Sequence, residues 1–83
     1  MTIKKQINAA KKRIERDKAQ RLRIGKSWKA KFRKLEKTGL SRASFCHTYK
    51  FNTAMMLRYV HGQRAPSWDT IAAVSGALEV NGV

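Results

Sequence analysis

Helix-capping and helix-ending residues alternate at short intervals after residue 38, and they leave room only for short helices. Three residues can each cap the N-terminus of a helix, namely Ser41, Asn52 and Ser67. Gly39 and Gly62 can end a helix, because glycine adopts the left-handed conformation without steric strain. No alternating apolar pattern indicates a strand. The sequence therefore predicts an all-α fold, with short helices at about residues 41–49, 53–61 and 67–78.

Apolar residues recur at the spacing of buried helix faces. Trp28, Phe32 and Leu35 stand at i, i+4 and i+7, which predicts another helix at about residues 27–37 with Ser27 as its N-cap. We expect a compact body of four helices, with a fifth helix preceding it. The other residues expected to face inward are Phe45, Cys46, Tyr49, Met56, Tyr59, Val60, Trp68, Ile71, Ala72, Val74, Ser75 and Leu78.

Positive charge is concentrated in the first part of the chain. The 83 residues include 19 Lys and Arg against 5 Asp and Glu, a net charge of +14, and residues 1–37 hold 15 of the basic and 3 of the acidic residues. Such a surface attracts polyanions. The sequence therefore predicts a basic helical N-terminal extension, residues 1–26, followed by a domain at residues 27–83.

The N-terminal extension is rich in good helix formers and contains no proline. Ile3, Ile7, Ala10 and Ile14 form a narrow apolar stripe, but the stripe ends after two heptad repeats, which is short for a coiled coil. We favour a solvated basic helix over a dimerising one. Gly25 interrupts the pattern, and the sequence leaves open whether the extension continues into the helix at 27–37.

Several classes of protein are disfavoured by what the sequence lacks. The single Cys46 has no partner for an internal disulfide, and no Cys/His spacing suggests a metal site. No apolar stretch approaches the roughly 20 residues of a membrane span, and no secretory signal is present. No nucleophile–base pair, carboxylate pair or phosphate-binding glycine loop suggests an enzyme. We expect a cytoplasmic, nucleoid-associated protein with no catalytic residues, cofactor, metal or evident small-molecule effector.

The two short helices on either side of residue 50 are joined by a tight turn, which is the arrangement of a helix-turn-helix. The spacing of their landmark residues continues without insertion into the last predicted helix. The landmarks are Gly39, Leu40, Ser41, Cys46, Asn52, Gly62, Arg64, Pro66, Ser67, Trp68, Ile71, Val74, Leu78 and Val80. In these positions residues 39–80 resemble the Cro and lambda-repressor-type helix-turn-helix family, part of the xenobiotic-response-element superfamily of phage and bacterial regulators.

The chain departs from the family pattern at three places. Lys50 stands in the turn where the family usually has glycine, so it must adopt a left-handed backbone or the turn must differ. Leu35 lies one residue closer to Gly39 than is usual, and Val60 replaces a usual acidic residue. Residues 1–26 lie outside the resemblance.

The resemblance implies a sequence-specific double-stranded DNA-binding protein, a small transcriptional regulator that binds DNA as a homodimer. Its recognition helix, at about residues 53–61, would lie in the major groove. The implied base contacts are Asn52, Thr53, Ala54, Leu57 and Arg58, with the Arg58 guanidinium suited to O6 and N7 of guanine. The implied phosphate contacts are Arg42, Lys50, Gln63 and Arg64.

Other partners of a basic chain remain as alternatives. A basic helix suits structured RNA or the ribosome as well as DNA. A membrane-surface helix at residues 3–23 is disfavoured, because its apolar stripe is thin and lacks Trp or Phe. The charge of residues 1–23 has no role in the family fold, and each cation gains by displacing a counterion from DNA. We therefore expect residues 1–23 to lie along the DNA backbone.

Overall fold

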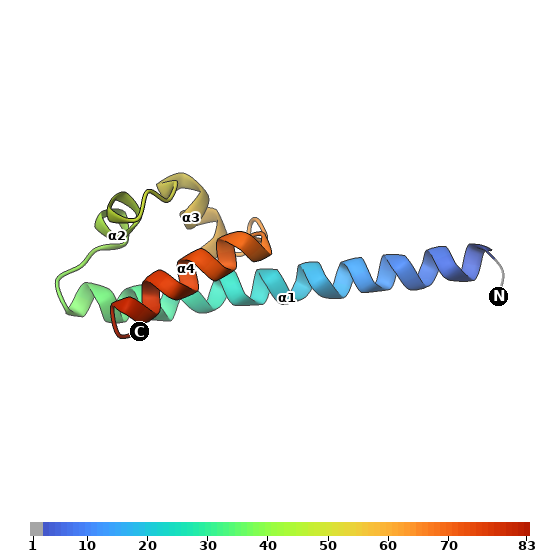
Figure 1. The fold of residues 1–83 in the computed structure, drawn as a ribbon, viewed down its shortest axis with the longest axis horizontal. Helices are drawn as coiled ribbons and strands as arrows, with labels where there is room; N and C mark the ends of the chain where they lie inside the picture. The colour runs from blue at the N-terminus through green and yellow to red at the C-terminus, as the bar shows by residue number, and fades with distance from the viewer. Residues whose placement is uncertain (1–2) are drawn as a thin grey trace.

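One helix of 35 residues, α1 (Ile3–Lys37), runs the whole length of the molecule (Figure 1). The computed structural model describes the backbone of residues 3–83 and the side chains of residues 9–83, in which every regular element is a helix. The extension and the predicted helix at 27–37 are thus continuous. Ser27 lies inside α1, where its Oγ donates a hydrogen bond to the Ile24 carbonyl oxygen at 2.5 Å. The prediction of Ser27 as an N-cap was therefore wrong.

Three shorter helices follow α1, and each begins at the capping residue that the sequence predicts. They are α2 (Arg42–Thr48), α3 (Thr53–Val60) and α4 (Trp68–Val80). Ser41 Oγ and Ser67 Oγ each accept a hydrogen bond of 3.1 Å from the backbone N–H three residues on, and Asn52 Oδ1 accepts one of 3.0 Å from Met55 N. These bonds satisfy N–H groups that have no partner within the helix.

The turn between α2 and α3 depends on a left-handed residue. Lys50 has a φ of 59°, the conformation anticipated from its place in the turn. A non-glycine residue there costs about 1–2 kcal/mol. The turn is closed by a hydrogen bond of 2.8 Å from Phe51 N to the Cys46 carbonyl oxygen, which brings the start of α3 back over the end of α2.

The hydrophobic core lies between the C-terminal half of α1 and the three short helices. Phe32 of α1 packs edge-to-face on Phe45 of α2, with ring centroids 5.2 Å apart. The core residues are Trp28, Phe32, Leu35, Phe45, Cys46, Met56, Val60, Ile71, Val74, Ala77 and Leu78. Most of them were expected from their spacing in the sequence, and Ala77 was not.

Two residues of α4 that were expected in the core lie outside it. Trp68 is 46% exposed, and Ala72 is exposed on the outer face of the helix. The core reaches only as far as Ile71 along α4, and the first residue of the helix lies against Asp17 of α1. The indole of Trp68 finds a hydrogen-bond partner there instead of an apolar one.

Gly25 is buried where the end of α3 and the following loop cross α1. A Cβ atom at this position would lie 3.0 Å from the Tyr59 carbonyl oxygen and 3.3 Å from Pro66 Cδ. The glycine therefore allows a close approach of two backbones, and helix continuity is retained at a propensity cost of about 1 kcal/mol.

The N-terminal part of α1 projects away from the other helices (Figure 1). Every side chain from residue 9 to residue 16 is exposed, and Ile14 is 67% exposed. The molecule measures 57 × 22 × 20 Å as a result. Of the apolar stripe in the extension, Ala10 and Ile14 are exposed, and the side chains of Ile3 and Ile7 lie outside the described residues.

Among residues 3–83, none of the helices combines the length and the apolar character that crossing a lipid bilayer requires.

Candidate nucleic-acid interface

The outer face of α3 is open to solvent along its whole length. Thr53, Ala54, Leu57 and Arg58 lie on it at i, i+1, i+4 and i+5, and all four are exposed. Leu57 keeps 40% of its surface in solvent, although it is a large apolar residue. The five residues predicted as base contacts, Asn52 included, are thus brought together on one surface.

The inner face of α3 fixes that surface in place. Met56 and Val60 are buried in the core, and the Tyr59 ring packs edge-to-face on Trp28 of α1 at a centroid distance of 6.2 Å. Asn52 Oδ1 accepts the capping hydrogen bond from Met55 N, and both Nδ2 hydrogens are left for a ligand. Asn52 can therefore donate to an acceptor on a ligand at the start of α3 while it caps the helix.

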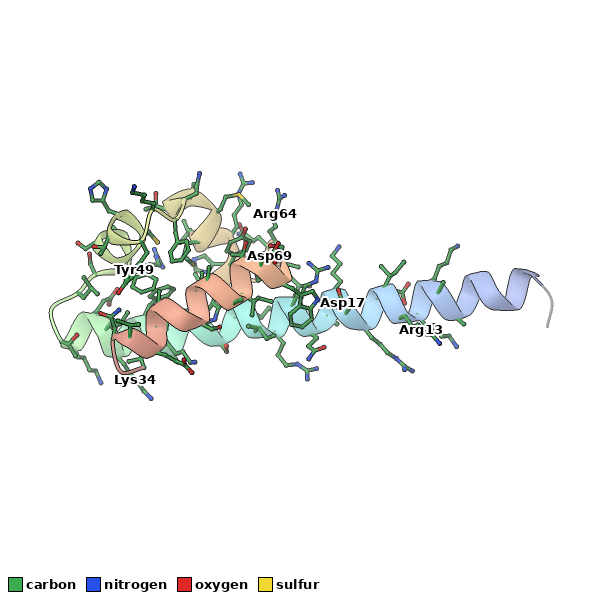
Figure 2. All side chains as sticks on the ribbon, viewed as in Figure 1. Arg13, Asp17, Lys34, Tyr49, Arg64 and Asp69 are labelled. Carbon is green, nitrogen blue, oxygen red and sulfur yellow. The ribbon has the colours of Figure 1, made fainter. Side chains whose placement is uncertain are left out.

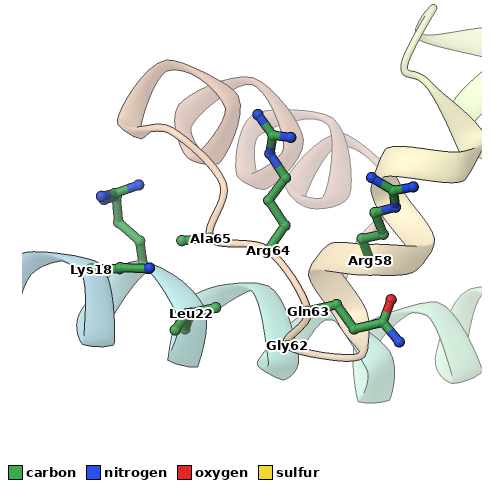
Figure 3. Close-up of a pocket in the computed structure, with 8 residues that line it drawn as sticks. Lys18, Leu22, Arg58, Gly62, Gln63, Arg64 and Ala65 are labelled. Atoms are coloured by element: carbon green, nitrogen blue, oxygen red, sulfur yellow. The ribbon is translucent and has the colours of Figure 1, made fainter.

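A groove runs beside this surface, between α1 and the loop that joins α3 to α4. We call it the α1–loop groove. Its volume is about 810 Å³, which admits an extended chain segment rather than only a small ion. The lining residues are Lys18, Arg21, Leu22, Arg58, Gly62, Gln63, Arg64 and Ala65. Figure 3 shows the side chains of Arg58 and Arg64 extending in the same general direction from α3 and from the loop.

A network of three hydrogen bonds ties the two walls of the groove together. Arg21 Nε contacts Asp17 Oδ2 at 2.8 Å, and Arg21 Nη1 donates to the Pro66 carbonyl oxygen at 3.1 Å. Trp68 Nε1 donates to the other carboxylate oxygen, Asp17 Oδ1, at 2.8 Å. Figure 2 shows Asp17 where α1 passes the start of α4. The hydrogen bond from Arg21, followed by that from Trp68, holds the pKa of Asp17 below its ordinary value of 3.8.

The positive charge of the groove is largely unneutralised. Among residues 9–83, Arg21 is the one cation with a carboxylate within ion-pair distance. Lys18, Arg58 and Arg64 are exposed, and none of them has a carboxylate oxygen of the described residues within 4.0 Å. A cleft lined by charges of one sign concentrates their field, so this groove is a favourable place for an anion.

The four residues predicted as phosphate contacts fall into two groups. Gln63 and Arg64 lie in the α1–loop groove next to Arg58. Arg42 is half-exposed at the first turn of α2, and Lys50 is exposed in the turn between α2 and α3. The groove thus brings together only part of the predicted set, while Arg42 and Lys50 lie along the helix-turn-helix itself.

Three residues of α1 were missed as members of this region, namely Lys18, Arg21 and Leu22. The sequence places them in the extension, more than forty positions before Arg64. The i,i+4 spacing of Asp17 and Arg21 was the one available signal, and it indicates an ion pair without indicating what lies beside it.

Cys46 is part of the core. It is fully buried, and burial raises the pKa of its thiol, an effect that the nearby positive charge of Arg42 partly opposes. The thiol is therefore protonated at neutral pH and packs as a small apolar group. In the described part of the chain, no three His, Cys, Asp or Glu side chains are grouped so that they could hold a metal ion.

Comparisons of the chain with protein-family models, with curated proteins and with solved structures found no significant match.

Proposed function

We propose that the protein binds double-stranded DNA at preferred sequences, with α2 and α3 acting as a helix-turn-helix of the Cro and lambda-repressor type. The observation that carries the proposal is the exposed outer face of α3, which the core holds from behind and which is bordered by cations that have no carboxylate partner among residues 9–83. An α-helix of this kind fits the major groove, where each base pair displays a distinct pattern of donors and acceptors.

Asn52 and the exposed residues of α3 would contact different groups on the base edges. Arg58 offers a planar fork of donors that matches O6 and N7 of guanine, and Asn52 offers its Nδ2 hydrogens to an acceptor on a base edge. Thr53, Ala54 and Leu57 offer methyl groups that suit the C5-methyl group of thymine. The exposure of Leu57 is explained if DNA covers it.

Phosphate contacts fix the position of the protein on the duplex. Arg42 and Lys50 flank the start of α2 and the start of α3, and Gln63 and Arg64 follow the end of α3. These side chains contribute affinity and register without selecting sequence. The protein would then act as a small phage or bacterial transcriptional regulator, bound as a homodimer to two half-sites about one helical turn apart.

The experiment that tests the proposal is selection of bound sequences from a random duplex pool at physiological salt, with a structured RNA hairpin as competitor. The expected result is enrichment of one duplex sequence, and an inverted repeat in it would support the homodimer. Equal binding to all duplexes would contradict sequence-specific regulation and would indicate DNA binding without sequence preference. Preferential capture by the hairpin would favour the RNA-binding alternative. Sedimentation of the complex with one chain per site would contradict the homodimer.

A further inference from the structure

We infer that the α1–loop groove holds a backbone segment of the same DNA duplex that α3 reads, so that Lys18 of the N-terminal helix and Arg64 of the loop contact its phosphates from opposite walls. This inference rests on the proposed function. It adds a second binding site to the helix-turn-helix, and it gives α1 a defined place in the complex.

Cations from three separate elements converge on the α1–loop groove. Lys18 comes from α1, Arg58 from α3 and Arg64 from the loop, yet all three line one groove without a carboxylate partner among the described residues. Cations that line the same groove repel one another, and an anion bound between them relieves that repulsion. A phosphodiester supplies one negative charge for each nucleotide that passes through.

The α1–loop groove is already formed in the free protein. Arg21 bridges the two walls, because its guanidinium contacts both Asp17 of α1 and the Pro66 carbonyl oxygen of the loop. Trp68 adds a second link to Asp17. A ligand therefore meets a site whose walls need no ordering, and less of its binding energy is spent on conformational entropy.

The lining of the α1–loop groove suits a nucleic-acid backbone better than a free anion. Leu22 and Ala65 add apolar surface between the cations, as a sugar–phosphate chain with its alternating apolar and charged parts requires. Gly62 has no side chain, and the aliphatic stem of Lys26 fills the space beside it. The lining is therefore extended and mixed rather than concentrated around one point.

The α1–loop groove is continuous with the outer face of α3. Arg58 belongs both to the outer face of α3 and to the lining of the groove. A strand that follows the edge of the major groove along α3 therefore leads directly past Arg58 into the α1–loop groove. Because α1 is a single continuous helix, contact at Lys18 also sets the direction in which its projecting part meets the duplex.

The test compares two double variants of equal net charge in the full chain. The groove variant is Lys18→Gln with Arg64→Gln. The control is Arg23→Gln with Lys34→Gln, both exposed and lying about 140° and about 160° around α1 from Lys18, on its far side. Arg58 is left unchanged because it is proposed to contact a base. Binding is measured on the selected duplex over a range of salt, and again with single phosphates replaced by neutral methylphosphonates.

The groove variant is expected to flatten the slope of log K against log salt by about 1.8, from two phosphates at about 0.9 each, and the control by much less. At one or two positions, a methylphosphonate should weaken DNA binding by the wild-type protein and by the control variant. The same substitution should leave DNA binding by the groove variant unchanged. Equal slopes and unchanged phosphate sensitivity in the two variants would overturn the inference while leaving the proposed function intact. If the wild-type protein selects no duplex, the proposed function fails and the inference fails with it.

Discussion

The indole Nε1 of Trp68 donates a hydrogen bond of 2.8 Å to Asp17 Oδ1, across 51 positions of sequence. This bond joins the first residue of α4 to α1 at the place where α1 leaves the helical body. Asp17 accepts from Arg21 through its other oxygen, so one carboxylate connects the projecting helix, the start of α4 and the loop before it. The position of the α1–loop groove depends on this carboxylate.

We expect the Asp17 network to stabilise the fold at neutral pH and to fail in acid. Because the pKa of Asp17 is lowered in the folded protein, its contribution is fully present above about pH 4 and disappears as the pH falls through the folded value. The melting temperature of Asp17→Ala should therefore lie below that of the wild-type protein at pH 7. The difference should shrink once the pH falls below the ordinary value of 3.8.

A second measurement separates this effect from general acid unfolding. Titration of the Asp17 carboxylate by NMR should give a pKa below the ordinary value of 3.8, because the hydrogen bonds from Arg21 and Trp68 favour its charged form. If the difference in melting temperature between the wild-type protein and Asp17→Ala stays constant from pH 7 to pH 3, the expected contribution of the Asp17 carboxylate is wrong.

We expect Gly25 to be intolerant of a side chain, in contrast to Gly76. Leucine should gain about 0.8 kcal/mol of helix propensity at either position. At residue 25 its Cβ would press on the Tyr59 carbonyl oxygen and Pro66, at a cost of about 1–3 kcal/mol or more, whereas at residue 76 a Cβ would have no atom within 4 Å beyond the neighbouring backbone of its own helix. Gly25→Leu should therefore lower, and Gly76→Leu should raise, the free energy of unfolding measured in urea. Equal effects of the two substitutions would show that the close approach at Gly25 is unimportant.

The short helices could be predicted from the sequence because their signals are local. Ser41, Asn52 and Ser67 each cap a helix through a hydrogen bond to the backbone three residues on, and the periodic apolar residues locate the core. For Lys50 the sequence left two possibilities open, a left-handed backbone or a different turn, and the structure has the first. Such features depend on a few neighbouring residues, so a single sequence reveals them.

The features that sequence reasoning missed depend on contacts between distant segments. Gly25 resembles an interruption when only its low helix propensity is considered, but the tertiary structure needs a residue without Cβ there. Trp68 has the spacing of a core residue, yet α4 begins beyond the end of the core. Lys18 belongs to the groove only because α1 is continuous, and nothing local to residue 18 reveals that.

We expect Arg58 and Arg42 to differ in what they contribute to DNA binding. If Arg58 reads a base, Arg58→Ala should cost about 1–3 kcal/mol on the selected duplex and should relax the preference at one base position. Arg42→Ala should weaken binding to all sequences equally, since a phosphate contact carries no sequence information. Both are measured by competition among single-base variants of the selected site. A uniform loss for Arg58→Ala would make it a phosphate contact, together with its neighbours in the groove.

The projecting part of α1 can be removed without disturbing the other helices if the truncation ends before Asp17. Sequence reasoning treated residues 1–23 as one unit, but Asp17 and Arg21 hold the loop before α4, so removing them would disturb the body. Deletion of residues 1–16 leaves that network in place. Because every side chain from residue 9 to residue 16 is exposed, the melting temperature should change little.

The deletion nevertheless removes six Lys and Arg and only one acidic residue, Glu15. If this segment lies along the DNA backbone, the slope of log K against log salt should flatten by several units of about 0.9, one for each phosphate that the shortened chain no longer neutralises. The preferred sequence should stay the same, because phosphate contacts do not distinguish bases. Both are measured by repeating the duplex selection and the salt titration with the shortened chain. An unchanged slope would mean that the projecting helix faces solvent or another protein, since a segment bound to phosphates cannot be removed without altering the release of counterions.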